Sequence, residues 1–285
     1  MKEGNLMSVI EVKHLTKDYG KGRGLFDVSI KVEKGEVYGY LGPNGAGKST
    51  TLRHLMGFIK ADHGSVTING MACRSEQKRL QQKVGYLPGE IALPEDMTGL
   101  GYLKLIGRMR KMTSTARRDA LLTYFEMDPS PSIKRMSKGQ KQKIAIVAAF
   151  MHEPEILLLD EPTSGLDPLM QKRFIDLVKE EKAKGTTVML SSHIFEEVEK
   201  VCDRVGIIRA GKLVQELAID EFRASQMKTF TVTYKDGREE SHSLLDSEMD
   251  AFIKALAQKD IASLREEKHS LEEYFMTFYG GESNV

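Results

Sequence analysis

The chain has 285 residues, which is enough for one large domain with an appendage or for two domains. It contains 42 Lys and Arg against 41 Asp and Glu, so its net charge of +1 excludes an overall field that would draw it to nucleic acid or to an acidic membrane. The start, MKEGNLMSVIEV, carries charges where a signal peptide needs an apolar stretch, which predicts a cytoplasmic protein.

The first elements read as strands. SVIEVKHL and LFDVSIKV alternate apolar and polar residues on either side of the turn YGKGRG, which is typical of half-buried strands. GEVYGYLG then runs as a strand into GPNGAGKST, and KSTTLRHLMGFIK carries apolar residues at helical spacing up to Ile59. The expected order is strand, Gly-rich loop, helix.

The Gly-rich loop matches a phosphate-binding pattern. Residues 42–49 fit G-x-x-x-x-G-K-[ST] between a predicted strand and a predicted helix, a context that disfavours the alternative of a structural turn. The glycines let backbone N–H groups and the helix N-terminus face phosphate oxygens. Lys48 would neutralise β/γ charge, Ser49 could offer its hydroxyl to Mg²⁺, and Thr50 could bond a neighbouring phosphate oxygen.

A polar, helix-rich middle follows, over about residues 89–135. It includes the basic run GRMRKMTSTARR, which is either a solvated helix face or a contact with a membrane surface or a partner loop. From Ser137, Ile144 and Val147 share one face of a further helix, whose start SKGQ reads as an N-cap. The apolar run IAIVAAFM in this helix is too short to span a bilayer.

Acidic residues end the next strand. EILLLD is a short apolar strand, as in a buried parallel sheet, and TTVMLSSH is the next one, which together indicate an α/β sheet. Asp160 could hold Mg²⁺ and Glu161 could deprotonate an attacking water, although a solvated acidic turn is the alternative. His193 ends the later strand, where ligands of parallel sheets bind, although a histidine there can also be structural.

The last sixty or so residues read as a separate α+β unit. FTVTYKDGREESHSL predicts two strands joined at Asp236-Gly237, and EMDAFIKALAQ predicts an amphipathic helix. A closing helix is expected from a capping box of Ser270 with Glu273, ending at Gly280. The two cysteines, Cys73 and Cys202, lie far apart, which predicts buried or idle thiols.

Over about its first 220 residues the chain resembles the ATP-binding cassette (ABC) ATPases. The matching segments occur in the family's order: Tyr19 as the residue that stacks on adenine, GPNGAGKST as Walker A, MSKGQ as the signature, ILLLDEP as Walker B, SGLD as the D-loop and His193 as the switch histidine. The resemblance implies a P-loop (RecA-like) core sheet with an N-terminal antiparallel β subdomain and a helical subdomain over about residues 89–150. We expect the ATPase domain to span residues 7–222 and a small α+β extension, similar to those of exporter ATPases, to span residues 225–285.

In this family two cassettes pair head to tail, and the signature of one closes over the ATP held by the other. The resemblance therefore assigns Glu161, His193 and Lys48 to catalysis and Ser49, Asp160 and Glu90 to the metal. The ATP-binding residues that it implies, in both molecules of the pair, are Tyr19, Gly42, Pro43, Asn44, Gly45, Ala46, Gly47, Lys48, Ser49, Thr50, Ser137, Gly139, Gln140 and Asp167.

Two motifs depart from the family pattern, the signature and the Q-loop. The signature's usual tandem glycines are Lys138-Gly139 here, and Met136 stands where Leu is usual. The position of the family's Q-loop glutamine is Gly89, and Glu90 next to it is a candidate replacement as a metal or water ligand.

The resemblance implies an ATP- and Mg²⁺-dependent ATPase subunit that drives a separate multi-span membrane permease, as an exporter, from the inner face of the membrane. Its second copy, or a paralogous subunit, would complete the dimer. One alternative is an ABC-type ATPase acting on ribosomes or DNA, whose typical coiled-coil insertion or second cassette is missing here. Another is a nucleotide-gated module that barely hydrolyses ATP, against which Glu161 and His193 argue. A GTPase is disfavoured because the sequence has no Asn-Lys-x-Asp motif.

Overall fold

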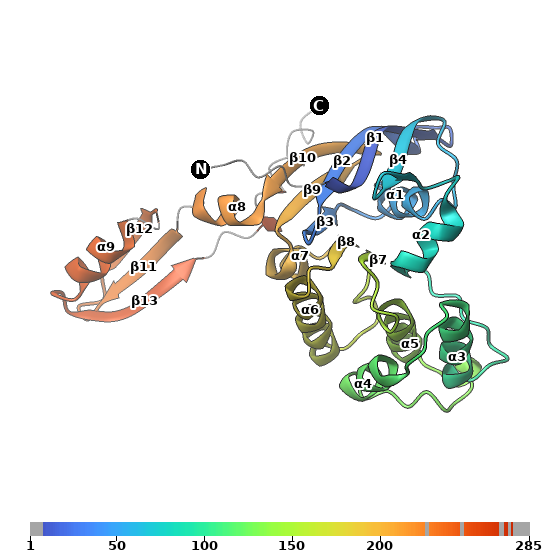
Figure 1. The fold of residues 1–285 in the computed structure, drawn as a ribbon. Coiled ribbons are helices and arrows are strands. Elements are labelled where there is room, and N and C mark those ends of the chain that lie inside the picture. The colour runs from blue at the N-terminus through green and yellow to red at the C-terminus, as the bar shows by residue number, and fades with distance from the viewer. Residues whose placement is uncertain (1–7, 226–227, 246–247, 268–270, 273–274, 276–285) are drawn as a thin grey trace. The chain divides into compact units, whose positions relative to one another are not determined.

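The computed structural model describes residues 8–225, 228–245, 248–267, 271–272 and 275 (Figure 1). The chain forms two compact units, Met1–Glu216 and Leu217–Val285. The predicted domain limits, 7–222 and 225–285, stay predictions. Among the described residues, no helix combines the length and the apolar character that crossing a membrane requires.

A four-stranded antiparallel sheet opens the first unit. Its strands, in the order β2-β1-β4-β5, are β1 (Ser8–Asp18), β2 (Gly24–Glu33), β4 (His63–Ile68) and β5 (Met71–Ala72). Buried and exposed residues alternate along most of β2, as its sequence predicts. The expected N-terminal antiparallel β region is therefore confirmed.

The second sheet of this unit has six strands in the order β10-β9-β3-β8-β7-β6. From β6 through β7, β8 and β3 to β9, each pair of neighbours is parallel, and every residue of β3, β7 and β8 is buried. The strands are β3 (Val37–Leu41), β6 (Val84–Leu87), β7 (Ile156–Asp160), β8 (Thr187–Ser192), β9 (Arg204–Arg209) and β10 (Lys212–Ala218). Because parallel strands end at the same edge, the segments that follow β3, β7 and β8 meet there.

Four helices accompany these strands: α1 (Lys48–Leu55), α2 (Gln77–Lys83), α6 (Pro168–Ala183) and α7 (Phe195–Val201). Helix α1 ends before the apolar periodicity does, since Gly57 follows it with a φ of 70° and so leaves the helical conformation. The expected continuation to Ile59 was wrong for this reason.

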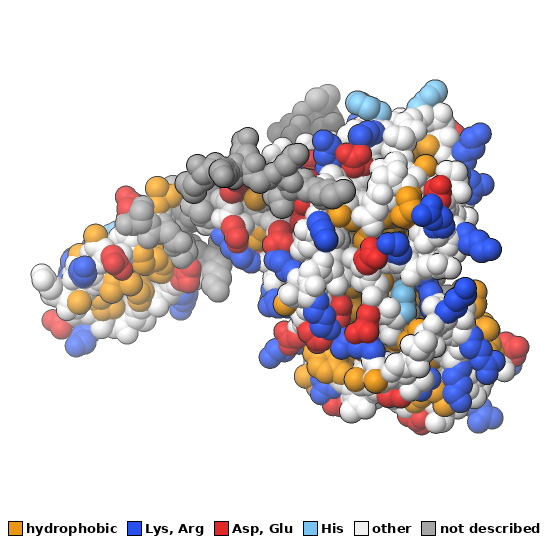
Figure 2. Space-filling view, in the orientation of Figure 1, with side chains coloured by type: hydrophobic (Ala, Val, Ile, Leu, Met, Phe, Trp, Pro, Cys, Tyr) orange, Lys and Arg blue, Asp and Glu red, His pale blue; other side chains and the backbone are white. Residues whose placement is uncertain are grey.

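The helical region expected in the middle of the chain is present. It contains α3 (Gly99–Met109), α4 (Ala116–Tyr124), the short 3₁₀ helix η1 (Ile133–Arg135) and α5 (Lys138–Phe150), which lie together in Figure 1. Within the basic run, Arg117 pairs with Glu181 at 2.5 Å and Arg118 with Asp119 at 2.8 Å. Lys104 and Lys111 are exposed, and Figure 2 shows Lys and Arg side chains gathered around this region. Part of the basic run thus has a structural role.

The second unit contains helix α8 (Ile219–Ser225) and a three-stranded sheet. Strand β11 (Lys228–Tyr234) lies between β12 (Glu239–Leu244) and β13 (Ile261–Glu267), antiparallel to both. The predicted hairpin is confirmed, with Gly237 at a φ of 86°, and so is the amphipathic helix, α9 (Met249–Leu256). Strand β13 was not predicted. Most of the predicted closing helix, with Ser270, Glu273 and Gly280, lies outside the described residues.

Candidate active site

The phosphate loop joins β3 to α1. Gly47, directly before α1, has a φ of 115°, and a Cβ atom there would meet Leu25 Cδ2 at 2.6 Å, so a side chain at this position would be strained. Lys48 is 5% exposed and donates through Nζ to the carbonyl oxygens of Gly42, at 2.6 Å, and Pro43, at 3.3 Å. The loop therefore holds a buried cation at the N-terminal end of a helix, which is an arrangement suited to phosphate.

A cavity of about 240 Å³ opens beside this loop. Tyr19, 50% exposed, lies on its wall together with most of the loop, so the structure brings the predicted adenine-stacking residue to the phosphate loop. The predicted residues that line the cavity are Tyr19, Pro43, Asn44, Gly45, Gly47, Lys48, Ser49, Thr50 and Glu161. Gly42 and Ala46 belong to the same loop but are not part of the lining.

Glu161 lies between two other predicted catalytic residues. Its Oε1 is 3.1 Å from Lys48 Nζ, and its Oε2 is 2.6 Å from Nδ1 of His193. The backbone of Glu161 has a φ of 47°, an uncommon conformation for a residue other than glycine that costs about 1–2 kcal/mol. In this turn, directly after β7, the Glu161 carboxylate contacts Lys48 from the phosphate loop and His193 from the end of β8.

Asp160, 2% exposed, accepts a hydrogen bond of 2.5 Å from the Ser191 hydroxyl, and the Ser191 carbonyl accepts the N–H of Glu161 at 3.0 Å. Ser191 thus fixes both acidic residues. Carboxylate and hydroxyl oxygens such as those of Asp160 and Ser49 are the ligands that Mg²⁺ prefers, so these residues fit a magnesium site. In the described part of the chain, no group of three or more His, Cys, Asp and Glu residues could hold a metal.

The Q-loop position lies next to this acidic group. A Cβ atom added to Gly89 would be 3.0 Å from Asp160 Oδ2, so position 89 faces the candidate metal ligand. Glu90 is exposed and does not line the 240 Å³ cavity. Its role as a metal ligand stays a prediction.

The signature and D-loop residues contact one another within the chain, away from the cavity lining. Ser137 caps α5 and forms a capping box with Gln140, which confirms the N-cap interpretation of SKGQ. A Cβ atom on Gly139 would be 2.8 Å from the Gly165 carbonyl oxygen, and Lys138 Nζ donates to Ser164 Oγ at 3.2 Å. Asp167 caps α6 by accepting the N–H of Met170. The glycine that the signature retains is therefore the one that packs against the D-loop.

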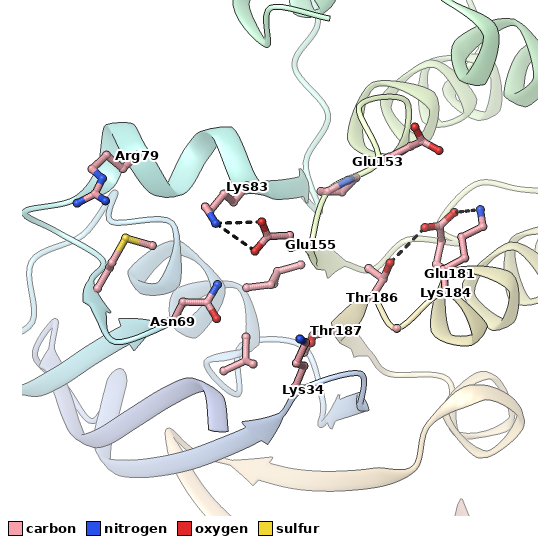
Figure 3. A pocket seen from close by; sticks show the side chains of 15 residues that line it. Lys34, Asn69, Arg79, Lys83, Glu153, Glu155, Glu181, Lys184, Thr186 and Thr187 are labelled. Carbon is pink, nitrogen blue, oxygen red and sulfur yellow. Dashed lines mark hydrogen bonds and ion pairs between the residues drawn. The ribbon is translucent and has the colours of Figure 1, made fainter. Parts of the chain in front are cut away.

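A larger cavity, of about 790 Å³, lies at the opposite ends of the strands (Figure 3). Ile156 and Thr187, the first residues of β7 and β8, line it. Its charged residues include a pair between Lys83 and Glu155 at 2.9 Å and a pair between Lys184 and Glu181 at 3.0 Å. No predicted site residue lines this cavity, and the amino ends of parallel strands are not where ligands usually bind.

Three residues of this site were not predicted from the sequence. Gly24, the first residue of β2, lines the 240 Å³ cavity. Arg23 lines the 240 Å³ cavity from the turn between β1 and β2, where its only sequence signal was its nearness to Tyr19. Ser191, which bonds Asp160, shows its role only once β7 and β8 are known to be neighbours.

The fold and this cluster of residues define a P-loop ATPase. Residues 25–164 match the family described as ABC transporter. The chain is 38% identical over 211 residues to the linearmycin resistance ATP-binding protein LnrL of Bacillus subtilis, covering 72% of this chain and 68% of that protein. It is 30% identical to the bacitracin transport ATP-binding protein BcrA of Bacillus licheniformis, over a match that covers 97% of this chain and 99% of that protein. The chain therefore belongs to the ABC transporter family, as an ATP-binding subunit with ATPase activity.

Solved structures agree with this assignment. The structure of an ATP-binding subunit of an ABC transporter matches with a TM-score of 0.69 and 34% identity, covering 76% of this chain and 92% of that one. The dimeric structure of MJ0796, a bacterial ABC transporter cassette, shares the fold with a TM-score of 0.68 at 24% identity. The match covers 74% of this chain and 98% of that one. The predicted fold class and the predicted ATPase function are confirmed.

Proposed function

We propose that two copies of this chain, or one copy and a paralogue, bind ATP between them and drive a separate multi-span membrane permease that exports its substrate. The observation that carries this proposal is the contact of Glu161 with both Lys48 and His193 beside the phosphate loop. The contact brings a carboxylate, a cation and an imidazole together beside the phosphate loop, which supports their joint action on one phosphate group.

In this proposal Lys48 neutralises charge on the β- and γ-phosphates, and the backbone N–H groups of the loop bind their oxygens. Glu161 orients the attacking water and takes its proton, while His193 contacts the γ-phosphate. Tyr19 stacks on adenine, and Arg23 adds a positive charge to the same cavity. Ser49 and Asp160 would hold Mg²⁺, which when bound neutralises phosphate charge.

The second copy would contribute Ser137, Gly139 and Gln140 over the bound ATP, with Asp167 at the seam. The N-terminus of α5, which Ser137 caps, carries a partial positive charge that suits a γ-phosphate. The dimeric MJ0796 cassette supports such pairing as a property of the fold.

Export is supported by the relatives, whose names concern linearmycin resistance and bacitracin transport. In this proposal the subunit lies on the cytoplasmic face of the membrane, held there by its permease. The names of these relatives give no support to the alternative of an ATPase acting on ribosomes or DNA.

The test is to tag a Glu161→Gln variant in its native cell, solubilise the membranes in mild detergent with ATP and Mg²⁺, and identify what co-purifies. Because this variant keeps its phosphate loop but loses its base, it should hold the ATP-bound complex together. We expect a multi-span membrane protein, whose cavity would then reveal the substrate. A Lys48→Ala variant serves as control and should not show ATP-dependent recovery. Ribosomal or DNA-bound proteins instead would reject the transport assignment.

A further inference from the structure

Glu197 is a buried carboxylate close to the proposed site but outside its cavity. It lies in the first turn of α7, four residues after His193, and is 7% exposed. A carboxylate so placed is costly unless hydrogen bonds compensate for its lost hydration, so its partners indicate what it does.

Its partner is Ser192, which is 1% exposed and directly precedes His193. The Ser192 hydroxyl donates to Glu197 Oε2 at 3.2 Å and accepts the N–H of Ile194 at 2.9 Å. The Ser192 carbonyl accepts the N–H of Gly42 at 3.4 Å. Ser192 therefore connects Glu197, the residue after His193 and the first residue of the phosphate loop.

The groups around Glu197 link it further to the site. Burial, the largest effect, raises the pKa of Glu197, and the nearby Glu161 carboxylate adds to this rise. Hydrogen bonds from the Thr163 and Ser192 hydroxyls, and the nearby His193, lower the same pKa. Thr163, which is 3% exposed, belongs to the segment that leads from Glu161 to the D-loop. Glu197 thus lies among the segments that carry Glu161 and His193.

We propose that Glu197 is a positioning residue, which holds the backbone of residues 192–194 through Ser192 and thereby aims the imidazole of His193 at Glu161 and at the γ-phosphate. Glu197 itself does not line the 240 Å³ cavity beside the phosphate loop. The catalytic consequence rests on the proposed roles of Glu161 and His193, whereas the orientation of His193 can be measured without them.

The kinetic test compares Glu197→Ala with Glu197→Gln. The alanine variant loses the acceptor for Ser192, so we expect its kcat for ATP to fall at least about tenfold while its nucleotide Kd stays within about threefold. The glutamine variant keeps a carbonyl acceptor of the same shape and should retain kcat within about threefold. Glu196→Ala is the matched control, since Glu196 is exposed on the same helix and pairs with Lys200. A Glu197→Ala variant with wild-type kcat would overturn the proposal.

Stability separates positioning from a general loss of packing. Because the folded-state pKa of Glu197 is raised, its ionised form opposes folding, and this cost grows as the pH rises through that pKa. Glu197→Gln should therefore unfold at no lower temperature than the wild type at pH 7.5. If Glu197→Gln is as stable as the wild type but as inactive as the alanine variant, the hydrogen bond to Ser192 is not what matters and the proposal is wrong.

A spectroscopic readout is independent of turnover. The imidazole ¹⁵N and ¹³C shifts of His193, assigned with a His193→Gln variant, should change in Glu197→Ala and in Ser192→Ala, and should match the wild type in Glu197→Gln. Unchanged His193 shifts in Glu197→Ala would overturn the positioning role even if Glu161 and His193 prove catalytic. If the His193 shifts change in Glu197→Ala while His193→Gln keeps normal turnover, the positioning role of Glu197 is supported and the proposed catalytic role of His193 is rejected.

Discussion

Glu161 combines an uncommon backbone conformation with two side-chain contacts, to Lys48 and to His193. A residue other than glycine with a positive φ persists only where its surroundings hold it in place. Here the N–H of Glu161 donates to Ser191, and its carboxylate contacts Lys48 and His193. These contacts hold the backbone and the carboxylate of Glu161 in one position, which is consistent with the proposed role of a base.

Glu161→Gln tests that role directly. We expect turnover to fall at least about a hundredfold, because a proton acceptor is lost, while ATP binding stays within about threefold of the wild type, because the phosphate loop is unchanged. Phosphate release and the binding of a fluorescent ATP analogue measure the two effects. Near-normal phosphate release would reject Glu161 as the base.

His152 is a half-buried histidine that does not line the 240 Å³ cavity. Burial lowers its pKa from 6.5 to about 4, and the nearby charge of Arg110 adds to this effect. The folded chain therefore favours neutral His152, and the resulting stability is present above pH 6.5 and is lost as the pH falls towards 4. The difference between these two pKa values of His152 corresponds to a change of about 3 kcal/mol at most in the free energy of unfolding.

We therefore expect His152→Gln to lose less free energy of unfolding than the wild type between pH 7.5 and pH 5. Urea unfolding at the two pH values measures the difference. The matched control is His63→Gln, since His63 is exposed on β4, and it should lose as much free energy of unfolding between the two pH values as the wild type. An identical loss in the wild type and in His152→Gln would show that His152 does not contribute.

At the scale of elements, the start of α5 is shaped by its contact with the D-loop. Because a Cβ atom on Gly139 would be 2.8 Å from the Gly165 carbonyl oxygen, Gly139→Ala must displace one of the two segments. We expect turnover to fall about tenfold, as the signature and the D-loop lose their relative placement. Gly107→Ala in α3 is the matched control, because its nearest neighbour is Met112 Sδ at 3.6 Å, an ordinary contact.

That control should keep full turnover, and since alanine favours helix more than glycine does, it should not unfold more easily. Steady-state ATPase assays and thermal unfolding of both variants measure these effects. Wild-type turnover in Gly139→Ala would show that the glycine is not needed for the proposed contact over ATP.

The elements also show how far the sequence predicts this structure. Strands β3, β7 and β8 and the phosphate loop follow from local patterns, because apolar runs and glycine spacing are read over a few residues, whereas β6 was not predicted. Strand β13 was missed because IASLREE lacks a clear alternation and is held by its pairing with β11. The contact between Glu161 and His193 could not be predicted from spacing, since it depends on β7 and β8 being neighbours in the sheet.

At the scale of the whole molecule, the residues assigned to one site fall into two groups. Lys48, Glu161 and His193 meet at the phosphate loop, whereas Gly139 packs against the D-loop, and neither Gly139 nor Ser137 lines the cavity. In the proposed pair, each copy would supply the phosphate-loop half of one site and the signature half of the other, so that two copies complete both sites.

We expect ATP to pair two copies of this chain. With ATP and Mg²⁺, Glu161→Gln should double its mass in light scattering coupled to size exclusion, because unhydrolysed ATP would hold two copies together. Adding Ser137→Arg should leave the chain monomeric, since the larger cationic side chain would obstruct the N-terminus of α5, while ATP binding by the monomer stays unchanged. If ATP binding by the monomer falls as well, Ser137 acts on the nucleotide of its own chain, and the assignment of the signature to the second copy is wrong.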